Sequence, residues 1–387
     1  MKNKHLTLRK IATVCISISL FLLTLEVAAR LDDRLKYGAP FLKLYSPQRL
    51  RGIDPDGIKH NVPNSSFEKW HINRFGFRGP DISLQKPTGT IRIACMGTSE
   101  TFGLHETPGS DWPAQLRDML SISGHFQVIN ASVAGLLLKE YVGYIDKYVL
   151  KFQPDIILLY INPFGYAIGV DKFDNRQDSL EPQVRTNQTK PKFSFKSISI
   201  HLRIVSKIKQ AIRNALPPAI LRSYRLMNMK KQIKWLESAR LNGNNPIDAV
   251  SQDSLDRFST DLEELLEFLN NQHVQVVLTS YPVLISSSNI EEYLEIFLDH
   301  RRFYVELSLL GIIDASHKFN EMIRNMALKH NVTFIDNNNK VPKNTRYFAD
   351  NVHYTDAGAT IIAENFANFI STNFVTVKSL DSSVDTM

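Results

Sequence analysis

Residues 91–103 read IRIACMGTSETFG, and this stretch decides the fold. Its first part, Ile91–Met96, is a short apolar run typical of a strand buried on both faces of a parallel sheet. Directly after it, Ser99 lies between Gly97 and Gly103, which predicts a tight turn that exposes the serine at the carboxyl end of the strand. A serine that only caps the following helix would give the same pattern, so the turn alone does not identify a site.

Four further apolar runs share these features, and helical stretches alternate with them. The expected strands are Ile91–Met96, Gln127–Ala131, Asp155–Ile161, Val274–Ser280 and Val332–Ile335. The expected helices are Trp112–Ile122, Lys139–Lys151, Leu255–Asn270, a long region near Phe303–Lys329, and Ala357–Thr372. This alternation predicts an α/β fold with three α/β/α layers around a five-stranded parallel sheet. In such sheets functional groups gather at the carboxyl ends of the strands.

A second polar element stands before the last expected helix. Asp350 precedes His353 by three residues, a spacing that lets a carboxylate orient the imidazole and hold its tautomer. The free ring nitrogen could then accept a proton from a serine nucleophile. A surface loop in which Thr355 or Asp356 caps the final helix would explain the same residues without any chemistry.

Two potential hydrogen-bond donors follow the second and third expected strands. Gly135 lets the backbone approach a ligand closely, and Asn162 offers a side-chain amide. Together with the N–H of Ser99 they could stabilise the oxyanion that forms when a serine attacks a carbonyl carbon. Each also has an ordinary explanation, as a turn glycine and as an Asn-Pro pair that begins a turn.

The order of these four elements resembles the SGNH (GDSL) hydrolase family, whose fold is flavodoxin-like, over about residues 90–372 without the insertion described below. The family's first block, G-D-S-x-T-x-G, is matched except that Thr98 replaces the aspartate. Its third block, G-x-N-D, is matched at Asn162, whereas Pro163 stands where the aspartate is expected. The upstream segment Asn73–Pro80 resembles the membrane-anchored bacterial branch of the family and is expected to form a turn packed on the main domain.

The resemblance implies a role for each site residue. Ser99 would be the nucleophile, His353 the general base and Asp350 its orienting partner. The oxyanion hole would consist of Ser99, Gly135 and Asn162. Neither a metal ion nor a cofactor is expected.

The implied activity is that of a serine esterase outside the cytoplasmic membrane, acting on O-acyl (O-acetyl) esters of a cell-envelope glycan. An O-acyltransferase that uses the same serine on a surface polysaccharide is an alternative. A further alternative is a non-catalytic glycan-binding or assembly protein on the same fold, suggested by the changes at Thr98 and Pro163. His105 and Glu106, just past the serine turn, could line the pocket or belong to an ordinary surface loop.

The N-terminus predicts a membrane segment. Four basic residues precede the uncharged run Ile11–Leu25, an arrangement that keeps the N-terminus in the cytoplasm and sends the following chain across the membrane. The run fits an uncleaved single-pass anchor in the bacterial inner membrane, and the small residues Val27–Ala29 also fit a signal-peptide cleavage site. A helix buried in the protein is the third interpretation.

Composition and charge bound the remaining possibilities. The 387 residues are 43% hydrophobic and 22% charged, which excludes a disordered chain. The expected organisation is a membrane segment at 1–30, an irregular surface segment at 31–88, the hydrolase domain at 89–372 and a tail at 373–387. The two cysteines, Cys15 and Cys95, are too few for a zinc ribbon, and an internal disulfide is not expected.

The net charge of +7 belongs to one segment of the chain. An insertion at 171–242, expected to be largely helical, holds 16 basic and 5 acidic residues, whereas the remainder holds 30 basic and 34 acidic. The insertion could be a solvated lid, a contact with anionic lipid headgroups or a grip on an acidic glycan. A nucleic-acid partner is not expected, because no recognised binding motif accompanies the charge.

Overall fold

The computed structural model describes residues 2–37, 41–42, 50–123, 125–169, 184–185, 246–294 and 306–375, together with residues 202–205, 207, 208, 211, 227, 231, 234, 296 and 304. Most of the insertion at 171–242, with the helical structure expected in it, lies outside the described residues.

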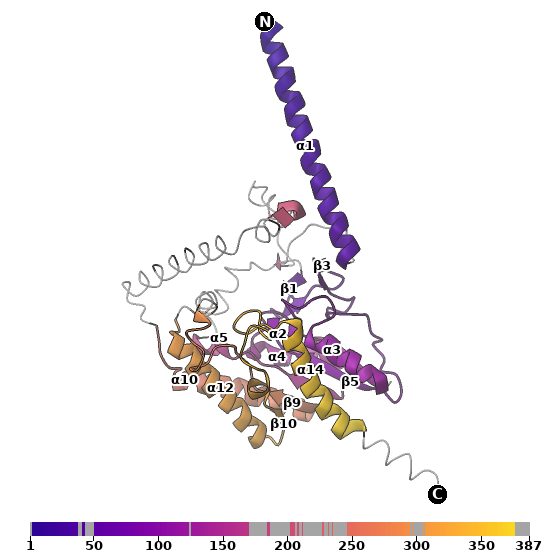
Figure 1. Ribbon diagram of the computed structural model, residues 1–387. Coiled ribbons are helices and arrows are strands. Elements are labelled where there is room, and N and C mark those ends of the chain that lie inside the picture. The colour runs from indigo at the N-terminus through magenta and orange to yellow at the C-terminus, as the bar shows by residue number, and fades with distance from the viewer. Residues whose placement is uncertain are drawn as a thin grey trace.

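A five-stranded parallel sheet forms the centre of the protein, as the sequence predicts (Figure 1). Its strands are β5 (Ile91–Met96), β6 (Phe126–Asn130), β7 (Ile156–Leu159), β9 (Gln275–Thr279) and β10 (Thr333–Ile335). The order across the sheet is β10-β9-β7-β5-β6, so the chain runs from β5 outward to β6 and then back across to β7. The carboxyl ends of β5 and β7 therefore flank the point where the strand order reverses, which is where open α/β sheets bind ligands.

Helices cover the sheet in two layers. One layer is formed by α3 (Trp112–Leu120) and α14 (Asp356–Ile370), which pack on each other. The other contains α4 (Tyr141–Tyr144), α10 (Gln252–Asn271) and α12 (Leu309–Lys329). Because both faces are covered, every residue of β7 is fully buried, which explains why the strand is an unbroken apolar run.

Two helix predictions need correction. The expected helix Lys139–Lys151 is a series of short turns: a 3-10 turn at Leu138–Glu140, then α4, then a π-helical segment at Ile145–Val149 and a final 3-10 turn at Leu150–Phe152. The helix expected near Phe303 begins only at Leu309, because Ser308 caps it by accepting a hydrogen bond from the Gly311 N–H.

The segment before the sheet contains short strands rather than irregular chain alone. β1 (Arg51–Ile53) pairs with β2 (Lys59–Asn61) and with β8 (Val184–Arg185), and β3 (Ser66–Phe67) pairs with β4 (Trp70–His71) as a hairpin. The predicted turn at residues 73–80 packs on the main domain, where the Arg78 N–H donates to the Asn130 carbonyl at 3.1 Å.

A single long helix, α1 (Lys2–Tyr37), projects from the domain (Figure 1). Within it, Arg9–Lys36 is long and apolar enough to cross a membrane, and 6% of its most apolar window is buried. This helix is therefore a candidate membrane span, and a signal sequence would satisfy the same criteria of length and composition.

Candidate active site

Ser99 is placed by the turn between β5 and the short helix α2 (Ser99–Phe102). A Cβ at Gly97 would overlap the Thr101 side chain and lie 3.0 Å from the Tyr160 carbonyl oxygen, so the turn has room only for glycine. Thr98 occupies the N-cap position, but its side chain makes no capping bond. The serine hydroxyl is instead directed to a histidine.

Ser99, His353 and Asp350 form a chain of hydrogen bonds. The Ser99 Oγ and His353 Nε2 lie 2.9 Å apart, and the His353 Nδ1 and Asp350 Oδ2 lie 2.7 Å apart. The sequence separation of Ser99 and His353 is 254 residues, and the fold brings them together at the carboxyl edge of the sheet. The geometry lets the imidazole accept the hydroxyl proton while the carboxylate holds its other nitrogen.

The loop that carries this pair is fixed at several points. The Asp350 Oδ1 accepts the backbone N–H of Val352 at 2.9 Å and that of His353 at 2.8 Å. Asn351 is fully buried, and its Oδ1 accepts the Ile285 N–H at 3.1 Å, which ties the loop to the segment after β9. Thr355 also caps α14, as the surface-loop explanation predicts. The same loop therefore caps the helix and places His353 beside Ser99.

The pKa values of His353 and Asp350 are both shifted by their surroundings. Burial alone lowers the pKa of His353, but the Asp350 carboxylate outweighs it and raises the pKa to about 9. Burial likewise acts to raise the pKa of Asp350, yet the charge of His353 and the hydrogen bonds from His105 and His353 hold that pKa well below its usual range. Asp350 is therefore ionised throughout the physiological range and favours a protonated His353.

The two predicted oxyanion donors occupy different surroundings. Gly135 is buried with φ of 82°, in the segment after β6 whose Val133 N–H donates to the Gly97 carbonyl at 3.2 Å. Asn162 follows β7, where its Nδ2 donates to Glu100 Oε1 at 2.9 Å and its Oδ1 accepts the Phe164 N–H at 3.0 Å. The Asn162 amide therefore already donates to a carboxylate, that of Glu100.

Glu100 is a residue whose importance the sequence did not reveal. Its side chain is buried, and it accepts hydrogen bonds from Asn162, from the Thr98 hydroxyl and from the Tyr281 hydroxyl. Burial and the charge of Glu100 together raise the pKa of Tyr281 well above its usual value. Thr98 is thus a hydrogen-bond partner of Glu100.

The loop after α2 also belongs to the site. His105 Nε2 lies 3.5 Å from Asp350 Oδ2, and its ring centroid is 5.2 Å from that of His353. Glu106 is buried, and burial raises its pKa to about 8. Asp356 at the start of α14 holds the loop by accepting the Thr107 N–H at 2.7 Å. Glu106 is therefore not an ordinary surface-loop residue, whereas His105 is an exposed loop residue that also contacts Asp350.

One group of described residues could hold a divalent ion. The ligand atoms of His105, Asp350 and His353 all lie within 4.8 Å of one another. Because Asp350 Oδ2 and His353 Nδ1 are already hydrogen-bonded to each other, an ion there would displace the bond that orients His353.

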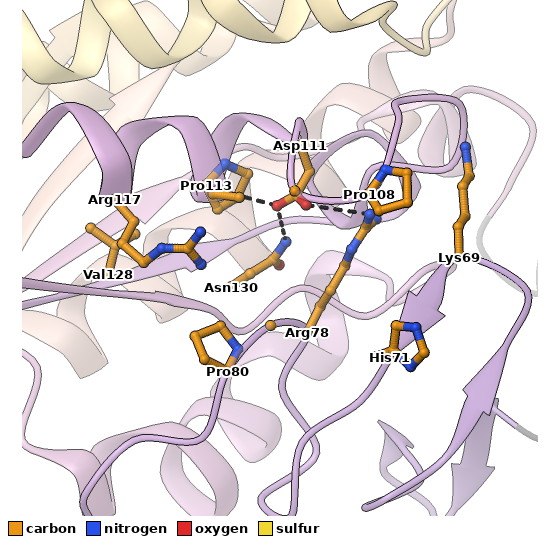
Figure 2. Close-up of a pocket in the computed structure, with 13 residues that line it drawn as sticks. Lys69, His71, Arg78, Pro80, Pro108, Asp111, Pro113, Arg117, Val128 and Asn130 are labelled. Carbon is orange, nitrogen blue, oxygen red and sulfur yellow. Dashed lines mark hydrogen bonds and ion pairs between the residues drawn. The ribbon is translucent and has the colours of Figure 1, made fainter. Parts of the chain in front are cut away.

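A cavity of about 170 Å³ lies behind this loop, between β4, α3 and β6 (Figure 2). The residues described as lining it include Arg78 and Asp111 but not Ser99, Asp350 or His353. Arg78 Nη2 and Asp111 Oδ2 lie 3.3 Å apart, and Arg78 Nη1 donates to the Gly103 carbonyl at 2.5 Å. Arg78 thus supports the end of α2 from the upstream segment.

Comparison with solved structures returns ester hydrolases. A lipase/acylhydrolase from Enterococcus faecalis is 12% identical, with a TM-score of 0.41 over 73% of this chain and 96% of the other. Axe2, an acetylxylan esterase from Geobacillus stearothermophilus, is 14% identical, with a TM-score of 0.37 over 72% of this chain and 94% of the other. A protein described as a member of the G-D-S-L lipolytic family, from Desulfitobacterium hafniense, is 12% identical, with a TM-score of 0.39 over 72% and 99%.

No protein-family model matches the chain, and no curated protein matches it.

Proposed function

We propose that the protein is a serine esterase of the SGNH type. The observation that supports this function is the hydrogen-bond chain from Ser99 through His353 to Asp350. A serine that only stabilised the turn would need neither an imidazole at 2.9 Å nor a carboxylate behind it.

The proposed mechanism uses this hydrogen-bond chain. The Ser99 Oγ attacks the ester carbonyl carbon as His353 Nε2 takes its proton, and Asp350 stabilises the imidazolium. The Ser99 and Gly135 N–H groups and the Asn162 amide stabilise the negative oxygen of the tetrahedral intermediate. His353 then gives its proton to the departing alcohol, and water activated by the same imidazole releases the acid from the acyl-enzyme.

The finer proposal concerns substrate and place. With α1 as an uncleaved anchor in the bacterial inner membrane and its basic end in the cytoplasm, the catalytic domain would face the cell envelope. The esters available there include O-acetyl groups on envelope glycans, and we propose these as the substrate class. The acyl-enzyme can also transfer its acyl group to a sugar hydroxyl, so the fate of that intermediate separates a hydrolase from an acyltransferase.

The test compares wild-type protein with Ser99→Ala on p-nitrophenyl acetate. We expect kcat/KM to fall at least about 10⁴-fold while the Tm is retained, because the hydroxyl makes one hydrogen bond in a half-buried position. Ser123→Ala, a serine in the turn after α3, is the matched control and should keep full activity. An active Ser99→Ala protein would refute the proposal. Release of acetate with and without added glycan measures the partition between water and sugar.

A further inference from the structure

The domain-side end of α1 is joined to the insertion by buried charges. The Asp33 side chain is 0% exposed, and its carboxylate lies 3.2 Å from Arg203 Nη2 and 2.8 Å from Lys207 Nζ. The Arg203 side chain is itself only 6% exposed. A buried aspartate with two cationic partners is a feature of packed protein structure, whereas a flexible tether would leave these groups in water.

A second carboxylate on α1 is held by the backbone of the same segment. Glu26 accepts the N–H groups of Arg203 at 3.0 Å and Ile204 at 2.9 Å, and its Oε1 lies 2.6 Å from Arg30 Nε. Consecutive backbone N–H groups are a natural anion cradle. Cleavage after Ala29 would remove Glu26 from this contact, so the contact favours a retained helix.

Arg203 also joins α1 to the edge of the active site. Its Nη1 lies 2.7 Å from Glu68 Oε1 in the turn between β3 and β4. Two residues later in the same hairpin, the Trp70 Nε1 donates to the Gly103 carbonyl at 3.2 Å. Gly103 is the residue that ends α2, the helix that begins at Ser99. Figure 1 shows the base of α1 beside β1 and β3, with α2 close below them.

We propose that Arg203 clamps α1 to the domain with the Ser99 site on the membrane-facing side, and that the substrate is an ester carried by a membrane-bound molecule. This inference rests on the proposed esterase function. The uncharged part of the helix ends at Glu26, about 24 Å along the helix from Lys10, so a span that begins near Lys10 leaves the hydrocarbon where the clamp begins.

Exposed apolar side chains accompany the clamp, as expected of a surface that touches lipid. Those on or near the base of α1 and beside Arg203 are Leu31, Leu35, Leu42, Leu202 and Ile208. The clamp also accounts for part of the positive charge of the insertion, because Arg203 and Lys207 neutralise acidic groups of α1. An ester in solution would gain nothing from this arrangement, whereas a headgroup ester would be presented to Ser99 at a fixed height.

The test uses full-length protein in vesicles of phosphatidylethanolamine and phosphatidylglycerol. The probes are a dodecyl glucoside and a methyl glucoside that carry the same single O-acetyl group. The clamp is removed with Asp33→Asn/Arg203→Met, because Arg203→Met alone would leave Asp33 buried without its main partner. Lys318→Met, which removes a cation paired with Asp314 at 3.0 Å on α12, is the matched control.

We expect wild type and the control to prefer the dodecyl glucoside, and the clamp variant to lose about tenfold of that preference. Its activity on the methyl glucoside should not change. An unchanged preference in the clamp variant would overturn the inference. If wild type hydrolyses neither glucoside nor p-nitrophenyl acetate, the esterase proposal fails instead.

A measurement without catalysis then tests the clamp by itself. A fluorophore on Ser66→Cys, in the β3–β4 hairpin of a Cys15→Ser protein, should be quenched by lipids spin-labelled on the headgroup. The same fluorophore on Asn271→Cys, at the end of α10, should not be quenched. Asp33→Asn/Arg203→Met should reduce the quenching at position 66, and equal quenching with and without the clamp would contradict the inference.

Discussion

In the proposed active site, the residues assigned to proton transfer and the residues assigned to the oxyanion hole are held in different ways. His353 and Asp350 lie on a short loop at the protein surface, with side chains 16% and 32% exposed, and are joined by ionic hydrogen bonds. Asn162 instead belongs to a buried group that contains Glu100 and Tyr281. The hydrogen bonds of the proposed proton-transfer half are therefore already made without substrate, whereas the amide assigned to the oxyanion half is bonded to a carboxylate.

This difference has a physical consequence for catalysis. Removing a member of the surface pair should abolish proton transfer and lower the stability less than a change in the buried group, because water can reach the loop and replace some of its hydrogen bonds. Removing a member of the buried group should affect both the rate and the stability, since its partners lose their hydrogen bonds away from water.

Asp350→Asn should have the largest effect, a fall in kcat of about 10⁴-fold on p-nitrophenyl acetate. The amide oxygen can still accept the backbone N–H groups of Val352 and His353, so the loop should keep its shape while the imidazole loses its ionic partner. Asp356→Asn is the control, because that carboxylate contacts Thr107 and not His353. Comparable losses in the two variants would show that the loop, and not the ionic pair, limits the rate.

The pH profile should show the next largest effect. Because the pKa of His353 is raised to about 9 and only the neutral ring accepts a proton, kcat/KM should increase roughly 50-fold between pH 7 and pH 9. Initial rates corrected for spontaneous hydrolysis measure the midpoint. A midpoint near 6.5, the ordinary value for histidine, would mean that Asp350 does not act on the ring.

The same pair should make stability depend on pH in a defined direction. The His353 pKa is raised above 6.5, so its contribution is fully present below pH 6.5 and is lost as the pH rises through about 9. The Asp350 pKa is lowered, so its contribution is present above its ordinary pKa of 3.8 and is lost on acidification. The Tm difference between wild type and His353→Gln should therefore shrink from pH 6 to pH 10.

Glu100→Ala should reduce kcat about 10- to 100-fold with little change in KM, because the Asn162 amide loses the acceptor that positions it. The buried partners Thr98 and Tyr281 also lose an acceptor, so the Tm should fall as well. Glu100→Gln keeps one acceptor oxygen and should recover part of kcat. A lower Tm with unchanged kcat would show that this carboxylate stabilises the fold and has no positioning role.

The sheet and the juxtaposition of Ser99 with His353 differ in how far sequence can predict them. Each strand is a run of apolar residues, and such a run predicts a buried strand directly from the sequence. The bounds of β5 are therefore predicted to the residue, and those of the other four strands to within two residues at either end. The distance between Ser99 and His353 depends instead on how β5 and the loop before α14 pack. Only the order of motifs suggested that contact.

Glu100 and the clamp escaped prediction for a related reason. A glutamate after a serine turn is expected to be exposed, because glutamate is rarely buried. Glu100 is buried because Asn162 and Tyr281 donate hydrogen bonds to it, and their positions are known only from the structure. Asp33 and Arg203 are 170 residues apart, and for the charge of the insertion the sequence left a solvated lid, a lipid contact and a glycan contact as explanations. The excess of basic residues in the insertion was consistent with an acidic partner. The sequence did not indicate that the partner is the acidic end of α1.

His105→Ala should have the smallest effect, because His105 supports the surface half from outside the hydrogen-bond chain. Its Nε2 lies 3.5 Å from Asp350 Oδ2 and its side chain is 47% exposed, so water can take its place. A weak hydrogen bond of this kind contributes about 0.5–1 kcal/mol, which corresponds to a two- to fivefold decrease in kcat/KM. His330→Ala is the control, since His330 Nε2 lies 3.6 Å from Glu263 in a comparable pair on another part of the surface. A decrease in activity as large as that of Asp350→Asn would mean that His105 itself transfers a proton. The surface half would then contain two imidazoles that take part in proton transfer.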